Sequence, residues 1–503
     1  MLGVDDDAGI HCREPHGGSG HVVGRRLIGS AGFTGRYEGV LMSKARRIMA
    51  LVTAGAAVLS MAACGAGGGA NGAASGANND PKANDNAQCQ NTVKKKGVEK
   101  VTLWAWYPAV EKVVDNFNEA HDDVQVCWTN VGNGSEAYKK FNTALKAKSG
   151  APDVMQVEAE ILPSYVSGAE KHLVDISQFG ADKEKSKYTA GSWNDVTLGG
   201  GKAVYAIPSD AGPFAMMYRK DIFDKYGVKV PTTWDEYAKA GKELKEKGFP
   251  GHIGNYAPNG TAMNVALFAQ KNAKVYDYDV SNPEDVGIDL TSTEVKDVMS
   301  YWQNLVKEGI VSTDDCYSND WYTKIVDGSY ATVVNASWLI GYVKGVSGAQ
   351  EGAVWQVTDA PKWDDSTPMV NQGGSTLAVT DQAKHTEAAA KVAIGLWDSD
   401  KNQEVAVKDS GNFPVMNSKL ESDDFINYEE PFLNNQKVND VLAPIAQGYK
   451  GYSFLPFQTY AYDEQTKAFT KIVRDGADVS STMTDLQKTL EDYAGQQGFT
   501  VKK

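Results

Sequence analysis

Several features that mark particular classes of protein are scarce in this sequence. It has five cysteines in 503 residues, too few for a small disulfide-scaffold protein. Its 64 acidic residues outnumber 50 lysines and arginines, and the net charge of −14 argues against a basic surface for nucleic acid. No apolar run reaches the ~18 residues that a membrane-spanning helix needs. What remains is a large acidic globular protein, whose length suggests roughly two to four domains.

Motifs of several enzyme classes are also missing. Four histidines follow residue 64, and no two of them stand at the spacing of a zinc site. The sequence has no Walker A loop, no Gly-x-Gly-x-x-Gly after the first predicted strand and no Gly-x-Ser-x-Gly elbow. We therefore expect no metal ion and no cofactor.

One pair of carboxylates keeps an enzyme in consideration. Glu158 and Glu160 follow a predicted strand at a spacing of two, so they share a face if the strand continues. Glycosidases use two carboxyl groups at a defined separation. The pair fits a solvated loop, a role in hydrogen bonding to a ligand, or catalysis. A secreted glycoside hydrolase is therefore the alternative function.

The N-terminal part is predicted to contain a targeting sequence. Residues 1–41 lack apolar periodicity, and we expect them to be a non-native extension ahead of the true start at Met42. Residues 42–63 read as a signal peptide, because a basic start precedes an apolar stretch at 48–59 that is too short to span a bilayer.

A cysteine stands at the expected cleavage site. Met61-Ala62-Ala63-Cys64 resembles the lipobox of bacterial lipoproteins. That resemblance implies cleavage before Cys64, acylation of its thiol and anchoring in a membrane. The alternative is an ordinary signal peptide with an incidental cysteine. Residues 64–88 are rich in Gly, Ala and Asn and are expected to form a flexible tether.

Three further cysteines lie in the exported part, where disulfides are permitted. They are Cys89, Cys127 and Cys316. We favour a Cys89–Cys127 disulfide, because both residues flank the first predicted βαβ unit. The other two pairings stay open.

The pattern of the exported part is that of an α/β protein. Residues 101–106, 124–128 and 153–157 resemble short strands, and helical segments at 108–120 and 135–148 separate them. Strands and helices of these lengths predict a parallel sheet with right-handed crossovers. Two later helices are expected after the capping-box sequences that begin at Thr233 and Thr291. Further strands are predicted at 331–335, 354–359 and 375–380, and further helices at 386–398 and 479–493.

Tryptophan is the most informative residue type. All eleven tryptophans follow residue 103, and four of them (Trp128, Trp234, Trp302 and Trp397) lie in periodic elements and are assigned to the core. The others lie near predicted strand ends or in loops, where open α/β sheets bind ligands. Flat aromatic faces pack against the C–H faces of sugar rings, while amides and carboxylates bind the hydroxyls.

Several segments resemble family 1 extracellular solute-binding proteins, which serve ABC importers for sugars. The similarity spans roughly residues 98–500 and is carried by these motifs: Leu103-Trp-Ala-Trp106, residues 207–227, Val230-Pro-Thr-Thr-Trp-Asp-Glu-Tyr237, Ala331-Thr-Val-Val-Asn-Ala-Ser-Trp338 and Asn371-Gln-Gly-Gly-Ser-Thr-Leu-Ala378.

This resemblance implies a fold and a function. The fold would be the two-lobe, periplasmic-binding-protein-like one, in which residues 89–503 form both lobes from discontinuous segments. A hinge would join the lobes, the chain would cross between them near 203–218, and the ligand would lie in the interlobe cleft. The protein would not be an enzyme but a monomeric carrier of a carbohydrate. It would be lipid-anchored on the outer face of the bacterial cytoplasmic membrane and would deliver its ligand to an ABC transporter permease.

The ligand and its contacts follow from the same resemblance. The many aromatic residues favour an oligosaccharide, and a binder of peptides or polyamines on the same fold is a further alternative. The matched positions that would contact the ligand are Trp106, Tyr107, Asn133, Glu158, Asp210, Gly212, Tyr256, Trp338, Gln372, Gly373, Gly374 and Phe413.

Overall fold

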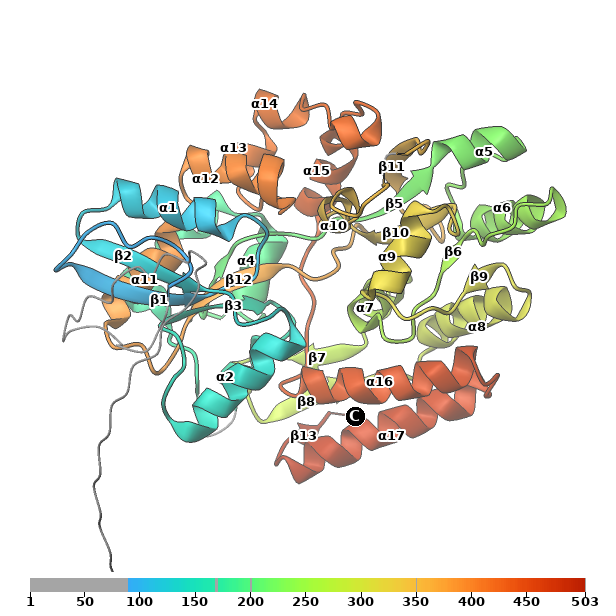
Figure 1. The fold of residues 1–503 in the computed structure, drawn as a ribbon. Coiled ribbons are helices and arrows are strands. Elements are labelled where there is room, and N and C mark those ends of the chain that lie inside the picture. The colour runs from blue at the N-terminus through green and yellow to red at the C-terminus, as the bar shows by residue number, and fades with distance from the viewer. Residues whose placement is uncertain (1–88, 168–170, 200, 350, 503) are drawn as a thin grey trace, which may run out of the picture. The chain divides into compact units, whose positions relative to one another are not determined.

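The computed structural model describes residues 89–167, 171–199, 201–349 and 351–502 (Figure 1). The predicted extension, signal peptide and tether, with Cys64, lie outside these residues. The described chain contains two main sheets and two smaller ones, and its buried apolar side chains form two clusters. The α/β class and the two-lobe architecture are thus confirmed.

Lobe 1 is built on a five-stranded sheet with the order β2-β1-β3-β12-β4. Its first strands are β1 (Glu99–Trp104), β2 (Val124–Thr129) and β3 (Val154–Glu158). They are parallel, as predicted, and α1 (Val110–Ala120) and α2 (Ser135–Ala147) connect them. Two later segments, β12 (Ser375–Val379) and β4 (Ile207–Pro208), complete the sheet, and β12 lies antiparallel to both of its neighbours.

Lobe 2 begins where the chain leaves β4 and enters β5 (Phe214–Arg219). This strand lies between β10 (Thr332–Ala336) and β11 (Trp355–Asp359) and is antiparallel to both. Alternate residues of β5 point to opposite faces. Ala215 and Met217 pack into the larger apolar cluster, and Phe214 and Met216 pack into the smaller one.

The remaining elements pack around the two main sheets or form a separate region, in which α16 and α17 lie with β7, β8 and β13 (Figure 1). The other helices are α3 (Pro163–Val166), α4 (Ala190–Val196), α5 (Lys220–Tyr226), α6 (Trp234–Glu246), α7 (Thr261–Gln270), α8 (Thr293–Lys307), α9 (Asn319–Val326), α10 (Leu339–Lys344), α11 (Thr386–Gly395), α12 (Asp400–Val405), α13 (Asn417–Leu420), α14 (Asp423–Ile426), α15 (Asn439–Gly448), α16 (Gln458–Val473) and α17 (Val479–Gln496). Short strands pair as β6 (Gly254–Asn255) with β9 (Val311–Ser312), and β8 (Asp285–Ile288) with β7 (Tyr276–Tyr278) and β13 (Thr500–Val501). None of the helices in the described ranges is long and apolar enough to cross a bilayer.

One of the two predicted capping boxes is displaced. Helix α6 begins as expected, because the Thr233 hydroxyl accepts a hydrogen bond from the Glu236 amide (3.1 Å). The box predicted at Thr291 is wrong: α8 begins at Thr293, with Ser292 as its N-cap. The Thr291 amide instead donates to the carboxylate of Asp289 (3.3 Å), which holds Thr291 in the turn before the helix.

A disulfide joins Cys89 to Cys127, the pairing favoured from the sequence. Cys127 lies in the middle of β2, and the bond therefore ties the start of the described chain to the edge strand of the lobe 1 sheet. Cys316 is buried and free.

Removing this bond should destabilise lobe 1. The two cysteines are 38 residues apart, and a loop of that length implies about 4 kcal/mol of stabilisation on the chain-entropy model. We expect the Cys89→Ala/Cys127→Ala variant to unfold at a lower denaturant concentration than the native protein. Equal midpoints under non-reducing conditions would contradict the expectation, and Cys316→Ala serves as the control.

Candidate ligand-binding site

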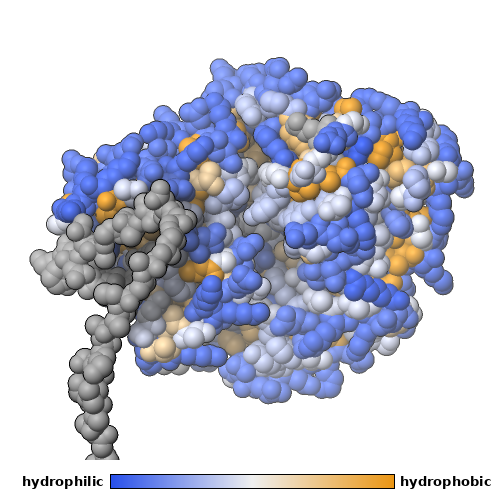
Figure 2. Space-filling model, viewed as in Figure 1, coloured by the Kyte–Doolittle hydropathy of each residue, from blue (hydrophilic) through white to orange (hydrophobic). Residues whose placement is uncertain are grey.

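Three large hydrophobic side chains stand out by their exposure. Hydrophilic residues cover most of the face shown in Figure 2. Among the described residues, the large hydrophobic side chains that remain exposed are Tyr317 (44%), Tyr342 (39%) and Met369 (48%). Two of the three belong to one group of rings. An exposed aromatic group on a mostly polar surface indicates a binding site.

We call this group of rings the aromatic cluster; it consists of Tyr317, Trp321, Tyr322, Trp338 and Tyr342. Helix α9 supplies Trp321 and Tyr322, the N-cap of α10 supplies Trp338, and α10 itself supplies Tyr342. Neighbouring ring centroids lie 5.1 to 6.4 Å apart, from Trp321–Tyr322 to Tyr322–Tyr342. Tyr317 has a backbone φ of 67°, a region that is costly for a bulky residue and is found mainly at functional sites.

Trp338 is held in place by the backbone of the neighbouring loop. Its indole N–H donates to the carbonyl oxygen of Gln372 at 3.1 Å. The Gln372 amide in turn donates to the Gly212 carbonyl at 2.7 Å. A Cβ atom on Gly212 would lie 2.0 Å from the Gln372 oxygen, so only glycine permits this approach. Position 373 also favours glycine, because its φ of +68° lies in the left-handed region.

Carboxyl groups from lobe 1 and from the crossing segment lie close to these rings. Burial raises the pKa of the Tyr342 hydroxyl, and the nearby charges of Asp210 and Glu158 raise it further. Burial raises the pKa of Glu158 to about 8, with a further contribution from the charge of Glu160. Burial likewise raises the pKa of Glu160 and of Asp210 to about 7. None of the ion pairs in the described part of the chain involves these three carboxyls, so no cation offsets their burial.

Several buried polar atoms around the aromatic cluster have no hydrogen-bond partner within the described residues. Buried polar groups are normally paired, so unpaired groups gathered in one place indicate a polar ligand. These atoms are Glu158 Oε2, Trp321 Nε1, Ser337 Oγ, Asn371 Oδ1 and Gln372 Oε1. The two amide oxygens accept, the indole N–H donates, and the serine hydroxyl and a protonated Glu158 carboxyl can do either. The arrangement suits a ligand rich in hydroxyl groups.

The structure brings most of the predicted positions together. Glu158, Asp210, Gly212, Trp338 and the 372–374 loop meet through the contacts above, and the Gly374 carbonyl also accepts from the Ala159 amide (2.9 Å). Trp106 is partly exposed, and its ring lies edge-on to Tyr138 at 5.9 Å. The Tyr138 hydroxyl accepts a hydrogen bond from the backbone amide of Glu158 (2.8 Å). Tyr138 therefore links Trp106 to the end of β3, where Glu158 lies.

Four predicted positions have a different surrounding. Tyr107 is buried behind the site, where its hydroxyl bonds to Ser209. Phe413 is buried with its carbonyl bonded to the Ala211 amide (2.9 Å), and it lines a separate pocket that it shares with Tyr342. Asn133 is exposed ahead of α2, and the described contacts do not join it to the aromatic cluster.

Tyr256 is the fourth, and it is fully buried in the smaller apolar cluster. Its hydroxyl donates to Asn264 at 2.6 Å, and its ring packs on Trp302 at 5.2 Å. The structure therefore gives it a role in the core of lobe 2 and does not bring it to the other positions.

The tyrosines of the aromatic cluster were missed from the sequence. Tyr342 lies four residues after Trp338, so both rings lie on one side of α10, and this spacing was a usable signal. Tyr317 had no such signal, since it follows a buried cysteine in a loop. Gln372 binds it there, donating to its hydroxyl at 3.1 Å.

The raised pKa of Glu158 predicts a pH-dependent stability. Its carboxyl has a pKa of about 8 in the folded chain and ~4.3 in the unfolded chain. Between these values the folded state retains a proton that the unfolded state releases, so this group lowers the free energy of unfolding as pH rises. Glu158→Gln removes that loss. In calorimetry, the melting temperature of the Glu158→Gln variant minus that of the native protein should increase by roughly 1–3 °C from pH 5 to pH 8.5.

The exposed Glu246, near the end of α6, provides the control, because Glu246→Gln should show no such trend. A difference between Glu158→Gln and the native protein that stays constant with pH would contradict the raised pKa.

Comparisons with known proteins agree with this geometry. A family model described as bacterial extracellular solute-binding protein matches residues 112–434. The arabinooligosaccharide-binding protein of Bacillus subtilis is 23% identical over 308 residues, which are 59% of this chain and 68% of that protein. The arabinooligosaccharide-binding protein of Halalkalibacterium halodurans is 23% identical over 254 residues, 49% of this chain and 54% of that protein.

Solved structures show the same fold. The ABC transporter associated binding protein from B. animalis subsp. lactis Bl-04, in complex with beta-1,6-galactobiose, has a TM-score of 0.71 and 29% identity; the match covers 81% of this chain and all of that one. The galacto-N-biose-/lacto-N-biose I-binding protein from Bifidobacterium longum, in complex with lacto-N-biose, has a TM-score of 0.70 and 23% identity, with the same coverage. Since the family model matches well over half of the residues, this chain belongs to the bacterial extracellular solute-binding proteins.

Proposed function

We propose that this protein binds an oligosaccharide between its two lobes and delivers it unchanged to the permease of an ABC transporter. The observation that carries the proposal is the aromatic cluster placed against unpaired buried polar atoms. The rings offer flat apolar faces to the C–H faces of sugars, and the Glu158 carboxyl and the Gln372 side-chain oxygen offer partners for hydroxyl groups. The saccharides named for the relatives support the same class of ligand.

The charges around the site favour a neutral ligand. An anionic ligand needs an arginine or lysine in the site, but Arg219, the arginine nearest to a matched motif, is bound to Asp221 (2.8 Å) and its guanidinium lies over Trp355. A polyamine would need ionised carboxylates, and burial opposes ionisation of Glu158, Glu160 and Asp210. A protonated carboxyl both donates and accepts a hydrogen bond, as does a sugar hydroxyl.

We propose that no bond is broken in the bound sugar. Membership in a family of solute-binding proteins supports a carrier over the alternative of a secreted glycoside hydrolase. The two lobes supply different halves of the site: Glu158 ends a strand of lobe 1, and Trp338 follows a strand of lobe 2. A ligand that contacts both favours the closed form by the difference in its affinity for the closed and open forms.

The site of action follows from the N-terminal sequence. We propose that the protein is exported, that Cys64 is acylated, and that the lipid anchors a monomer to the outer face of the bacterial cytoplasmic membrane. The support is the lipobox-like Met61-Ala62-Ala63-Cys64 sequence and the extracellular family.

Removing the Trp338 ring should weaken sugar binding without unfolding the protein. Trp338→Ala deletes a partly exposed apolar face, and we expect a loss of about 1–3 kcal/mol in titration calorimetry. The matched control is Trp363→Ala, because Trp363 packs on Trp234 and Tyr301 in lobe 2, away from the site. Unchanged affinity in Trp338→Ala would contradict its role as a stacking surface.

A thermal-shift screen tests the proposal as a whole. The panel contains arabino-oligosaccharides, β-1,6-galactobiose, lacto-N-biose and other neutral oligosaccharides, with glycerophosphate and spermidine as charged probes. A ligand at 100 times its Kd stabilises the folded state by about 2.7 kcal/mol. We expect a shift with a neutral saccharide and its recovery intact by chromatography. Cleavage products would favour the hydrolase, and a shift with a charged probe alone would overturn the choice of ligand class.

A further inference from the structure

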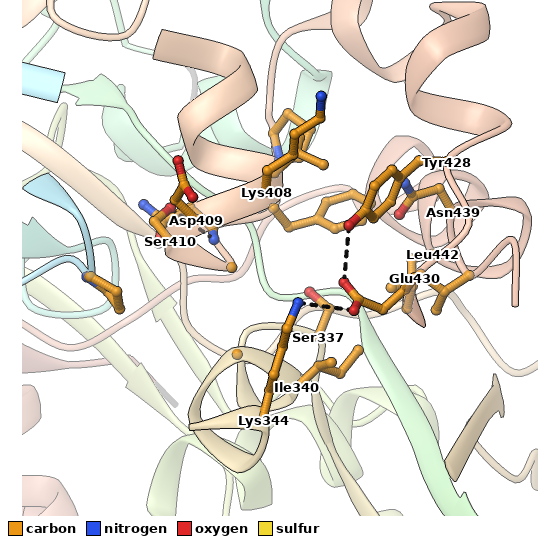
Figure 3. A pocket seen from close by; sticks show the side chains of 18 of the residues that line it. Ser337, Ile340, Lys344, Lys408, Asp409, Ser410, Tyr428, Glu430, Asn439 and Leu442 are labelled. Carbon is orange, nitrogen blue, oxygen red and sulfur yellow. Dashed lines mark hydrogen bonds and ion pairs between the residues drawn. The ribbon is translucent and has the colours of Figure 1, made fainter. Parts of the chain in front are cut away.

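A side pocket, drawn in Figure 3, shares the Tyr342 side chain with the aromatic cluster. We define it by Ser337, Tyr342, Lys344, Asn412, Phe413 and Glu430, and its cavity volume is about 170 Å³. Tyr342 belongs to both the pocket and the aromatic cluster, and Ser337 directly precedes Trp338. A group bound in the pocket therefore lies beside a group stacked on the rings.

The backbone around the pocket has an unusual, tightly packed form. Residues Ala406–Ser410 make one turn of π-helix after α12, a feature that is rare and is often found at functional sites. Gly411 follows with a φ of 71°, and a Cβ on it would lie 3.2 Å from the Cα of Gly341 in α10. This close approach brings Asn412 and Phe413 against α10.

Two polar side chains that line the pocket are buried and unpaired. Asn412 is 5% exposed and Ser337 is 7% exposed. Within the described residues, neither the Asn412 amide nitrogen nor the Ser337 hydroxyl has a hydrogen-bond partner. Leaving such groups unpaired is costly, and a ligand hydroxyl can pair with both kinds of atom.

The charges in the pocket are already compensated. Glu430 is buried, and its carboxylate binds the Lys344 ammonium at 2.9 Å and accepts from the Phe432 amide at 3.0 Å. The Tyr428 hydroxyl reaches the same carboxylate at 3.5 Å (Figure 3). Two more charged residues line the pocket, and both are paired: Lys408 with Glu404 (2.6 Å) and Asp409 with Lys112 (3.2 Å). Each of these lining charges thus has a partner of opposite sign, and a charged ligand group would lose hydration without gaining an unpaired counter-ion.

Part of the remaining wall is apolar, and the cavity is small. Phe413 and Phe425 pack edge-to-face at 5.5 Å, and Leu442 lies beside them. Pockets for whole drug-sized ligands measure roughly 300–1,000 Å³, so this cavity is smaller than that range. It therefore has room for one sugar ring but not for a complete oligosaccharide.

We propose that one neutral sugar residue of the bound oligosaccharide occupies the side pocket while its neighbour stacks on the aromatic cluster. This inference rests on the proposed function and adds a minimum ligand of two residues, of which the one in the pocket is uncharged. The amide of Asn412 donates to a sugar hydroxyl, the hydroxyl of Ser337 bonds to another, and Phe413 packs against the C–H face of the ring.

Titration calorimetry on three variants tests the proposal. The probes are β-1,6-galactobiose, lacto-N-biose and arabino-oligosaccharides of two to five residues. For a probe that the native protein binds, Asn412→Ala should lower affinity about 3- to 10-fold, since one hydrogen bond is lost. Ser337→Ala should act in the same direction. Asn427→Ala removes an exposed asparagine after α14 and should leave affinity unchanged.

The outcomes separate this inference from the function beneath it. If Trp338→Ala weakens binding while Asn412→Ala and Ser337→Ala bind as the native protein does, the side pocket is empty in the complex and the inference fails alone. If no saccharide binds the native protein, the proposed function fails and the inference falls with it. Melting temperatures confirm that each variant is folded before its affinity is compared.

Discussion

The close approach of two crossing segments is the constraint on which the site depends. Residues 209–213 leave lobe 1, residues 370–375 return to it, and Gly212 and Gln372 bond where they meet (2.7 Å). Because no Cβ fits at Gly212, the two backbones come close enough for the Gln372 carbonyl to hold the Trp338 indole. The Asp210 carboxylate binds the amide of Ser375 in the same seam. The segments that connect the two lobes therefore also hold the Trp338 ring in place.

Burying the polar groups of the site costs free energy when no ligand is bound. Glu158, Glu160 and Asp210 are buried without counter-ions, which raises the pKa of each carboxyl. Groups of this kind favour neutral partners that both donate and accept hydrogen bonds, and sugar hydroxyls meet that requirement. The same principle extends to the side pocket, where Glu430 is paired with Lys344 and the unpaired buried atoms belong to Asn412 and Ser337.

Much of the fold was predictable because local patterns determine it. The parallel unit β1-α1-β2-α2-β3 follows from apolar periodicity within about sixty residues, and the family motifs predicted the two lobes. The insertion of β12 between β3 and β4 was not predictable, since both of its strand partners lie far from it in the sequence. Capping at Thr291 failed because a competing side chain, Asp289, binds its amide.

The site was predictable where motifs carried it and not where packing did. Glu158, Asp210 and Trp338 lie in recognisable segments and meet in the structure. Tyr256 also lies after a matched segment, but a tyrosine looks the same in sequence whether its ring faces a ligand or the core. Tyr317 has a positive backbone φ of 67°, and no pattern in the sequence predicts this conformation.

The disulfide at the edge of lobe 1 has a mechanical consequence. Besides the bond to Cys127, the Gln90 amide donates to the Trp128 carbonyl, and Asn91 bonds to Val126 and Trp128. The first described residues thus run along the outer edge of β2. A pull applied through the N-terminal end would meet a covalent link there before it could peel β1 from the sheet, so lobe 1 would bear the load as a unit.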